Sequence, residues 1–228
     1  MSSPNHTFKF SESTMMESLF QDSHYDVGSG ARHYPGYLNP DRQSALLSDI
    51  RAVVTQAPLY RPAMPRSGKL FSVQMTNCGS LGWVSDKTNG YRYQATHPMT
   101  GRAWPPIPDA LLDIWADLAP GSPEPEAALI NFYEPDARLG LHRDEDEEDF
   151  NVPVISLSLG DEARFRIGGS ERRDKTRSLR LLSGDAFVLA GPARLAYHGI
   201  DKVFAGTSQL LASGGRINIT MRRVTKPL

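Results

Sequence analysis

The sequence lacks paired cysteines, long apolar runs and a secretory leader. Cys78 is the only cysteine among 228 residues, which excludes an intramolecular disulfide and is typical of a reducing cytosol. No apolar run approaches the roughly 18 residues that a membrane span needs. The N-terminus has neither the basic segment nor the apolar segment of a secretory signal. We therefore expect a cytoplasmic protein that has no membrane partner.

The chain also lacks a strong charge of either sign. Its formal net charge of -1 gives no global attraction to nucleic acid, so any such binding has to come from a local basic patch. The composition, 39% hydrophobic and 22% charged, is that of an ordinary globular protein. We expect a monomer with a mobile polar arm, residues 1–35, carrying one short helix around Met15–Phe20, and a single domain, residues 36–228.

Two helices are predicted in the first half. Asn39 can cap a helix from Pro40 to about Gln56, in which Pro40 suits the first turn and apolar residues recur on one face. A second helix is expected over Pro108–Leu118, again with one apolar face.

From Ala127 onward the pattern changes to period two. Gly, Pro and Asp punctuate the short apolar runs, and we expect a hairpin turn at Leu182–Phe187. This pattern predicts a mostly β (α+β) fold, with helices packed outside an antiparallel jelly-roll core. The expected strands are Ala128–Tyr133, Val154–Gly160, Ala163–Gly169, Ser178–Gly191 and Arg216–Arg223.

The segment GLHRDEDEED, residues 140–149, contains candidate metal ligands. His142 and Asp144 are two apart on an extended segment, so their side chains share a face. With a second histidine they would form a facial triad that suits Fe(II), and His198 at the end of a late strand can supply it. The alternative is a chance His-x-Asp pair in a solvated acidic turn. We expect the acids from Glu145 to Asp149 to be mostly solvated.

The segment RINITMR, residues 216–222, places Arg216, Asn218, Thr220 and Arg222 on one face of a strand. Burying two arginines is unfavourable without anions. A dicarboxylate would satisfy them, because guanidinium pairs with carboxylate through two parallel hydrogen bonds. The alternative is an ordinary strand whose polar face lies in water.

Together, His142-x-Asp144, His198 in YHG and RINITMR resemble the AlkB family of Fe(II)- and 2-oxoglutarate-dependent dioxygenases, in particular its bacterial DNA-repair members. The resemblance runs from about Gln56 to Arg222. It implies a double-stranded β-helix core, residues 127–228, preceded by helices and a nucleotide-recognition lid, residues 36–126. Further matching segments are Met75–Trp83, Gly90–Tyr93, Leu129–Asp144 and Ile155–Gly160.

The resemblance also implies roles for individual residues of the cofactor site. His142, Asp144 and His198 are expected to hold iron, and Arg216 to pair with the distal carboxylate of 2-oxoglutarate. The remainder of the co-substrate pocket is expected to consist of Asn131, Tyr133, Asn218 and Arg222.

On the substrate side, the resemblance implies that Trp83 stacks on a flipped base and that Asp146 reads its exocyclic amino group. Tyr91 and Tyr93 are expected to contact the nucleotide, and Arg172 to lie beside it. The chain departs from the bacterial pattern at Glu145, where a lysine is usual, and at Leu189 and Lys69, where aromatic residues are usual.

The implied activity is oxidative demethylation of 1-methyladenine and 3-methylcytosine in single-stranded or locally opened DNA, with RNA left open. It couples O2 and 2-oxoglutarate to succinate, CO2 and formaldehyde. Two alternatives stay open at this point: the same chemistry on RNA, protein or a small N-methyl compound, and a non-catalytic jelly-roll binding module.

Overall fold

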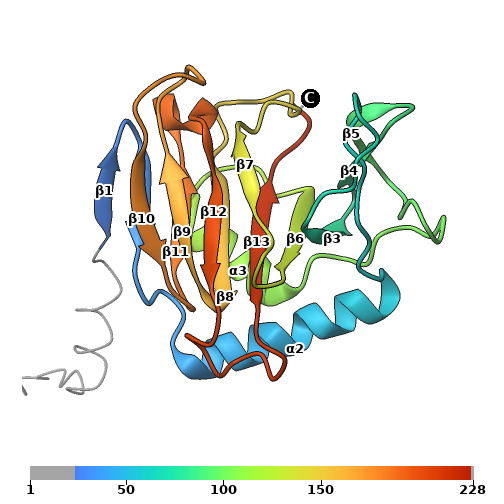
Figure 1. Cartoon of the computed structure of the whole chain (residues 1–228), viewed down its shortest axis with the longest axis horizontal. Coiled ribbons are helices and arrows are strands. Elements are labelled where there is room, and N and C mark those ends of the chain that lie inside the picture. Colours follow the sequence, from blue (N-terminus) through green and yellow to red (C-terminus); the bar gives the residue numbers. More distant parts are fainter. Residues whose placement is uncertain (1–23, 227–228) are drawn as a thin grey trace, which may run out of the picture.

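Two antiparallel sheets form the centre of the molecule in the computed structural model, which describes residues 24–226 (Figure 1). The seven-stranded sheet contains, in spatial order, β1 (Tyr25–Gly28), β2 (Ala31–Tyr34), β11 (Ala186–Leu189), β8 (Val154–Gly160), β13 (Arg216–Arg222), β6 (Ala127–Tyr133) and β3 (Gln74–Gly79). The four-stranded sheet contains β10 (Arg177–Leu181), β9 (Glu162–Ile167), β12 (His198–Phe204) and β7 (Leu139–His142). The expected jelly-roll core is confirmed.

The space between the sheets is mainly apolar. Alternate residues of β9, Phe165 and Ile167 among them, point inward to meet Phe187 and Leu189 of β11. Ile200 of β12 belongs to the same buried cluster. Because successive side chains of a strand point to opposite faces, the other face of each sheet is left for helices or for solvent.

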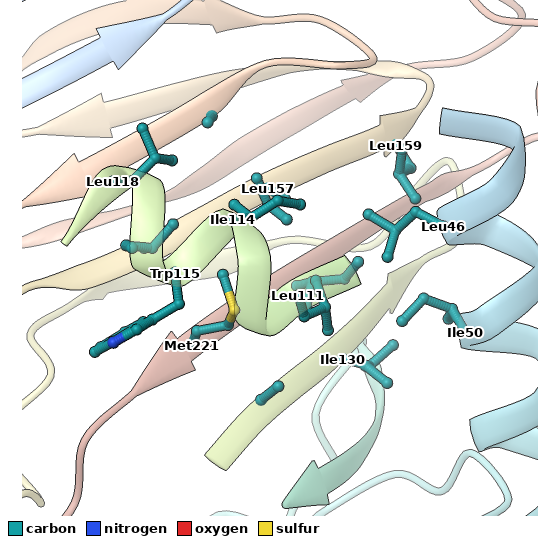
Figure 2. Packing of buried hydrophobic residues seen from close by; sticks show 14 of the residues in the cluster. Leu46, Ile50, Leu111, Ile114, Trp115, Leu118, Ile130, Leu157, Leu159 and Met221 are labelled. Carbon is teal, nitrogen blue, oxygen red and sulfur yellow. The ribbon is translucent and has the colours of Figure 1, made fainter. Parts of the chain in front are cut away.

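Both predicted helices pack on the outer face of the seven-stranded sheet. They are α2 (Pro40–Gln56) and α3 (Asp109–Leu118). The Asn39 side chain accepts a hydrogen bond from the Arg42 amide at 2.9 Å, which confirms the predicted cap. Figure 2 shows the buried layer, in which Leu46 and Ile50 of α2 and Leu111 and Ile114 of α3 lie over strand residues such as Ile130, Leu157 and Met221. No helix in residues 24–226 is long and apolar enough to cross a membrane.

The first described residues are not a mobile arm, and that prediction is wrong for residues 25–34. Tyr25–Gly28 and Ala31–Tyr34 form a hairpin at the edge of the seven-stranded sheet, where β2 pairs with β11. The turn between them has positive φ at Gly28, Ser29 and Gly30, the conformation for which glycine is suited. Residues 1–23, with the helix expected around Met15–Phe20, lie outside the described part.

The predicted hairpin at Leu182–Phe187 is also wrong. This segment turns, but β10 belongs to the four-stranded sheet and β11 to the other, so it crosses between sheets. Asp185 stabilises the crossing: its carboxylate lies 2.8 Å from His33 Nε2 and accepts hydrogen bonds from the amides of Gly36 and Leu182. A turn stabilised by side-chain hydrogen bonds has the same residues whether the next strand joins the same sheet or the other sheet. The sequence therefore does not distinguish a hairpin from a crossing.

A separate hairpin, β4 (Gly82–Asp86) and β5 (Gly90–Gln94), lies beside β3 at one end of the large sheet (Figure 1). Asn77 of β3 holds it, because its side-chain amide donates to Trp83 O at 3.0 Å and accepts from Trp83 N at 3.0 Å. The hairpin carries Trp83, Tyr91 and Tyr93 and is joined rigidly to the core. A 3-10 helix, η1 (Gly191–Leu195), connects β11 to β12.

Replacing Leu111 with alanine tests the helix–sheet layer. Leu111 is fully buried, so Leu111→Ala should lower the free energy of unfolding by about 3 kcal/mol through lost burial and the cavity left behind. The neighbouring Leu112 is only partly buried, and Leu112→Ala should lower it by less than about 1 kcal/mol. Urea denaturation measures both, and equal losses would contradict this packing.

Candidate active site

The pairing of β7 with β12 brings two histidines together. His142, the last residue of β7, lies directly opposite His198, the first residue of β12, and their ring centroids are 4.6 Å apart. Asp144 follows two residues after β7. Donor atoms of His142, Asp144 and His198 all lie within 4.8 Å of one another. The three residues singled out from the sequence thus converge on one point.

Backbone carbonyls orient both imidazoles. Nδ1 of His142 lies 2.9 Å from Gly140 O, and Nδ1 of His198 lies 2.9 Å from Ala196 O. A carbonyl can only accept, so each Nδ1 carries a proton, and Nε2 is the ring atom left to face a ligand. Burial, followed by the nearby His142, lowers the pKa of His198 to about 4, which leaves this ring neutral at physiological pH. Two imidazoles oriented in this way can bind a metal through Nε2.

Gly199 allows the two strands to approach. A Cβ atom at this position would lie 2.6 Å from Leu139 O and 2.8 Å from Gly140 O, closer than real Cβ atoms approach. Any side chain would therefore push β7 away from β12. At Gly140, by contrast, a Cβ would meet nothing within 4 Å.

Asp144 is held as a charged carboxylate. Its Oδ2 accepts hydrogen bonds from Arg222 Nη2 at 2.9 Å and Nε at 3.1 Å, and both side chains are buried. Burial raises the pKa of Asp144, but the charge of Arg222, with smaller effects from His198 and His142, outweighs burial and holds that pKa well below its usual range. The Oδ1 atom lies 4.0 Å from His142 Nε2.

Glu147 is buried, an exception to the expectation that the acids from Glu145 to Asp149 are mostly solvated. Its Oε1 accepts from Tyr93 Oη at 2.5 Å and lies 3.3 Å from Arg222 Nε, while Oε2 accepts from Arg194 Nη2 at 3.0 Å. Arg194, in η1, also donates to Asp144 O at 2.8 Å. Sequence inspection missed Glu147 and Arg194, because a buried acid in a run of six acids carries no local signal.

The cavity between the sheets contains unpaired polar groups. Arg216 is fully buried and donates to Ser158 Oγ at 2.7 Å, yet within residues 24–226 it forms no ion pair. Burial lowers the pKa of Arg216 to about 10. Arg216 Nε, Asn131 Oδ1 and Arg222 Nη1 are buried without a hydrogen-bond partner, and all three residues line this cavity. Tyr133, Asn218, Thr220 and both histidines line it too. Such groups are unfavourable unless a ligand satisfies them.

The predicted substrate-side residues lie around the triad. Trp83 stacks on Tyr91 with ring centroids 5.4 Å apart, and its Nε1 donates to Asp146 Oδ2 at 2.8 Å. Tyr93 bonds Glu147, as described above. Arg172 donates to Leu141 O at 2.8 Å, one residue before His142. The structure therefore brings all five residues that were predicted to contact the substrate to one side of the molecule. The hydroxyl group of Tyr93, however, is already bonded to the buried Glu147.

Comparison with known proteins agrees with this geometry. Residues 30–222 match the family model described as the 2OG-Fe(II) oxygenase superfamily. The chain is 53% identical over 192 residues to the alpha-ketoglutarate-dependent dioxygenase AlkB homolog of Caulobacter vibrioides, covering 83% of this chain and 86% of the relative. It is 41% identical over 185 residues to AlkB of Escherichia coli, covering 79% and 84%. The chain belongs to the AlkB family of 2OG-Fe(II) oxygenases.

Two further comparisons extend the similarity. The solved structure of OsALKBH1 superposes with a TM-score of 0.76 at 28% identity, covering 88% of this chain and 100% of that one. The DNA N(6)-methyladenine demethylase ALKBH1C of Arabidopsis thaliana is 28% identical over 217 residues, covering 82% of this chain and 47% of the relative. As a member of this family, the protein is an oxidoreductase that uses Fe(II), 2-oxoglutarate and O2, which confirms the predicted enzyme class and cofactors.

Removing the charge of Glu147 tests the buried network. Glu147→Gln leaves Arg194 without its only carboxylate partner in residues 24–226 and should lower the free energy of unfolding by about 3 kcal/mol, because a buried charge loses its partner. Glu148, the exposed neighbour, provides the matched control, and Glu148→Gln should change it by less than about 0.5 kcal/mol. Urea denaturation measures both variants, and an unchanged stability in Glu147→Gln would refute the network.

Proposed function

We propose that this enzyme oxidatively demethylates N-alkylated bases, such as 1-methyladenine and 3-methylcytosine, in DNA and reverses alkylation damage directly. The observation that supports the chemistry is the cavity in which a His-Asp-His triad adjoins buried arginine and asparagine atoms that have no partner. The names of the relatives, among them a DNA demethylase, support the substrate class. Succinate, CO2 and formaldehyde would be the further products.

His142, Asp144 and His198 would hold the iron. Two neutral imidazoles and one carboxylate on one face are the donor set that suits Fe(II) in oxygenases, so the residues present fit the metal. When bound, the iron supplies the oxygen activation that oxidises the methyl group. The role of the protein is to fix the ligands: the carbonyls of Gly140 and Ala196 orient the imidazoles, and Arg222 keeps Asp144 ionised.

Arg216 would receive the distal carboxylate of 2-oxoglutarate. Its guanidinium is buried at the cavity wall without an acidic partner in the described chain, and a carboxylate would restore both its charge balance and its missing hydrogen bond. Asn131 and Tyr133 lie on neighbouring β6, where Tyr133 is paired with Arg216 across the strands. Burial raises the pKa of Tyr133, so its phenol remains a hydrogen-bond donor. Asn218 and Arg222 Nη1 would complete the pocket.

The flipped base would be recognised at the lid hairpin. Trp83 and Tyr91 offer stacked aromatic surface beside the triad, and a base removed from its stack needs such a surface. Asp146, fixed by Trp83 Nε1, is placed to accept from an exocyclic amino group. Its negative charge also complements the positive charge of a base methylated at a ring nitrogen. Arg172 would lie at the rim.

A second candidate is the same oxidation on RNA or another N-methyl substrate. The three departures from the bacterial pattern favour keeping it. Glu145 forms an ion pair with Arg143 at 2.6 Å instead of supplying a cation. Leu189 lines the cavity, and Lys69 is exposed in the segment between α2 and β3. Preference for single strands, the monomeric state and the cytoplasmic location stay predictions from the sequence.

The deciding experiment follows a short single-stranded DNA carrying one 1-methyladenine by mass spectrometry. With Fe(II), 2-oxoglutarate and ascorbate, the wild-type enzyme should remove one methylene mass and form succinate. His142→Ala should do neither, because one ligand of the triad is gone. Binding of Mn(II) to both proteins, measured by calorimetry, should weaken in the variant and gives a readout independent of turnover.

Other outcomes separate the candidates. Succinate formed without demethylation of the DNA, but with demethylation of a methylated RNA, would favour the second candidate. Absence of both products from folded wild-type protein that binds Mn(II) would contradict oxidative demethylation altogether.

Arg216→Met tests the co-substrate pocket. Loss of the buried charge–charge contact should weaken 2-oxoglutarate binding by about 3 kcal/mol, roughly a hundredfold in Kd. Calorimetric titration with 2-oxoglutarate in the presence of Mn(II) measures it. Arg138→Met, which removes an exposed arginine, is the control and should bind as the wild type does. Equal affinity in all three proteins would exclude Arg216 as the anchor.

A further inference from the structure

The outer face of the four-stranded sheet carries a row of three cations. In the strand register, Arg180 of β10 lies opposite Arg164 of β9, and Arg164 lies opposite Lys202 of β12. The three side chains are therefore neighbours across the strands. All three are exposed. Like charges in directly opposed positions destabilise a sheet. This cationic row therefore does not serve the fold.

The surroundings neutralise the row only in part. Glu162 lies 3.2 Å from Arg180 and Asp201 lies 3.6 Å from Arg164, whereas Lys202 has no acidic partner in residues 24–226. Residues 162–181 and 198–204 together contain eight Lys and Arg but four Asp and Glu, in a chain whose formal net charge is -1. These segments therefore carry an excess of four positive charges.

The cationic side chains are partly ordered before any ligand binds. The guanidinium of Arg180 lies over the ring of Phe204 at 4.2 Å, and Lys202 Nζ lies 5.2 Å from the same ring. These cation–π contacts hold the two stems against the sheet while the charges face outward. An anion that binds here meets a preformed surface and loses less conformational entropy.

A loop connects the row to the catalytic cavity. Between β9 and β10 it carries Arg172, Arg173 and Lys175, all exposed, and Arg172 bonds the backbone next to His142. In the other direction, β12 runs from His198 at the triad to Lys202. Four residues of strand span about 13 Å. Along the axis of a duplex, one strand carries a phosphate every 3.4 Å or so.

We propose that the cationic row Arg164, Arg180 and Lys202 binds the phosphodiester backbone of the nucleic acid substrate, about 13 Å from the triad and outside the lesion nucleotide. No helix covers this sheet in Figure 1, whereas α2 and α3 pack on the other. The row gives a nearly neutral protein a local surface that binds a polyanion. It would also make substrate length a determinant of affinity. This inference rests on the proposed function, since it assumes a nucleic acid substrate.

The test compares two matched double variants. Arg180→Gln/Lys202→Gln removes two cations from the row, and Arg42→Gln/Arg51→Gln removes two exposed cations from α2. Binding of the Fe(II)- and 2-oxoglutarate-loaded full chain is measured anaerobically by fluorescence anisotropy. The probes are a single-stranded DNA of about 15 nucleotides with a central 1-methyladenine, its duplex, and a lesion trinucleotide, chosen within the range of known site sizes.

For the row variant, the slope of log K against log salt should fall by about 1.4 and Kd for the long strand should rise about fivefold at low salt, since two phosphate contacts are lost. The trinucleotide should bind as before. An unchanged slope on both long probes would overturn the proposal. So would an equal loss on the trinucleotide or in the α2 control. A loss on the duplex alone would assign the contact to the complementary strand, and a loss on the single strand to the lesion strand.

A charge-retaining variant, Arg180→Lys/Lys202→Arg, should bind as the wild type does. If it loses as much affinity as the neutral variant, packing on Phe204 and not charge is responsible, and the proposal fails. The readout needs no turnover. A wild-type enzyme that binds long strands through the row but never demethylates them would contradict the proposed function and leave the row intact.

Discussion

The buried ion pair between Arg222 and Asp144 ties the two sheets together at the point where chemistry takes place. Arg222 ends β13 of the large sheet, and Asp144 follows β7 of the small one. Two charges removed from water are stable only when they are paired, so this contact limits the distance between the sheets at the cavity. Glu147 and Arg194 extend it. The position of the candidate metal-binding carboxylate and the contact between the two sheets at the cavity therefore depend on the same ion pair.

Much of this arrangement could be predicted from local patterns. The cap at Asn39 and the 3.6-residue period gave α2 its bounds, and alternation gave β8 and β13 theirs, because these signals lie within a few residues of one another. The convergence of His142 with His198 was predicted from the place of His198 at the end of a late strand, and the family resemblance supported it. Strands β1 and β2 were missed, since four-residue strands with one or two buried side chains each have no detectable period.

What the sequence could not provide was pairing between distant segments. Glu147 is indistinguishable from its acidic neighbours until Tyr93, Arg194 and Arg222 surround it. Likewise, Arg164, Arg180 and Lys202 become a row only through the register of three strands. Net charge averages such features away, because the buried acids Asp144 and Glu147 pair with buried arginines and the basic outer face is balanced elsewhere in the chain, so neither appears in the composition.

Gly199 shows how tightly the site limits the evolution of the chain. Two backbone carbonyls occupy the space that any side chain at Gly199 would need, whereas the space around Gly140 is open. Every single-base change that alters the amino acid at position 199 adds a Cβ atom, so selection should remove nearly all such alleles. Position 140 faces no such limit. Among orthologues we therefore expect position 199 to stay glycine while position 140 drifts, although the two lie against each other on adjoining strands.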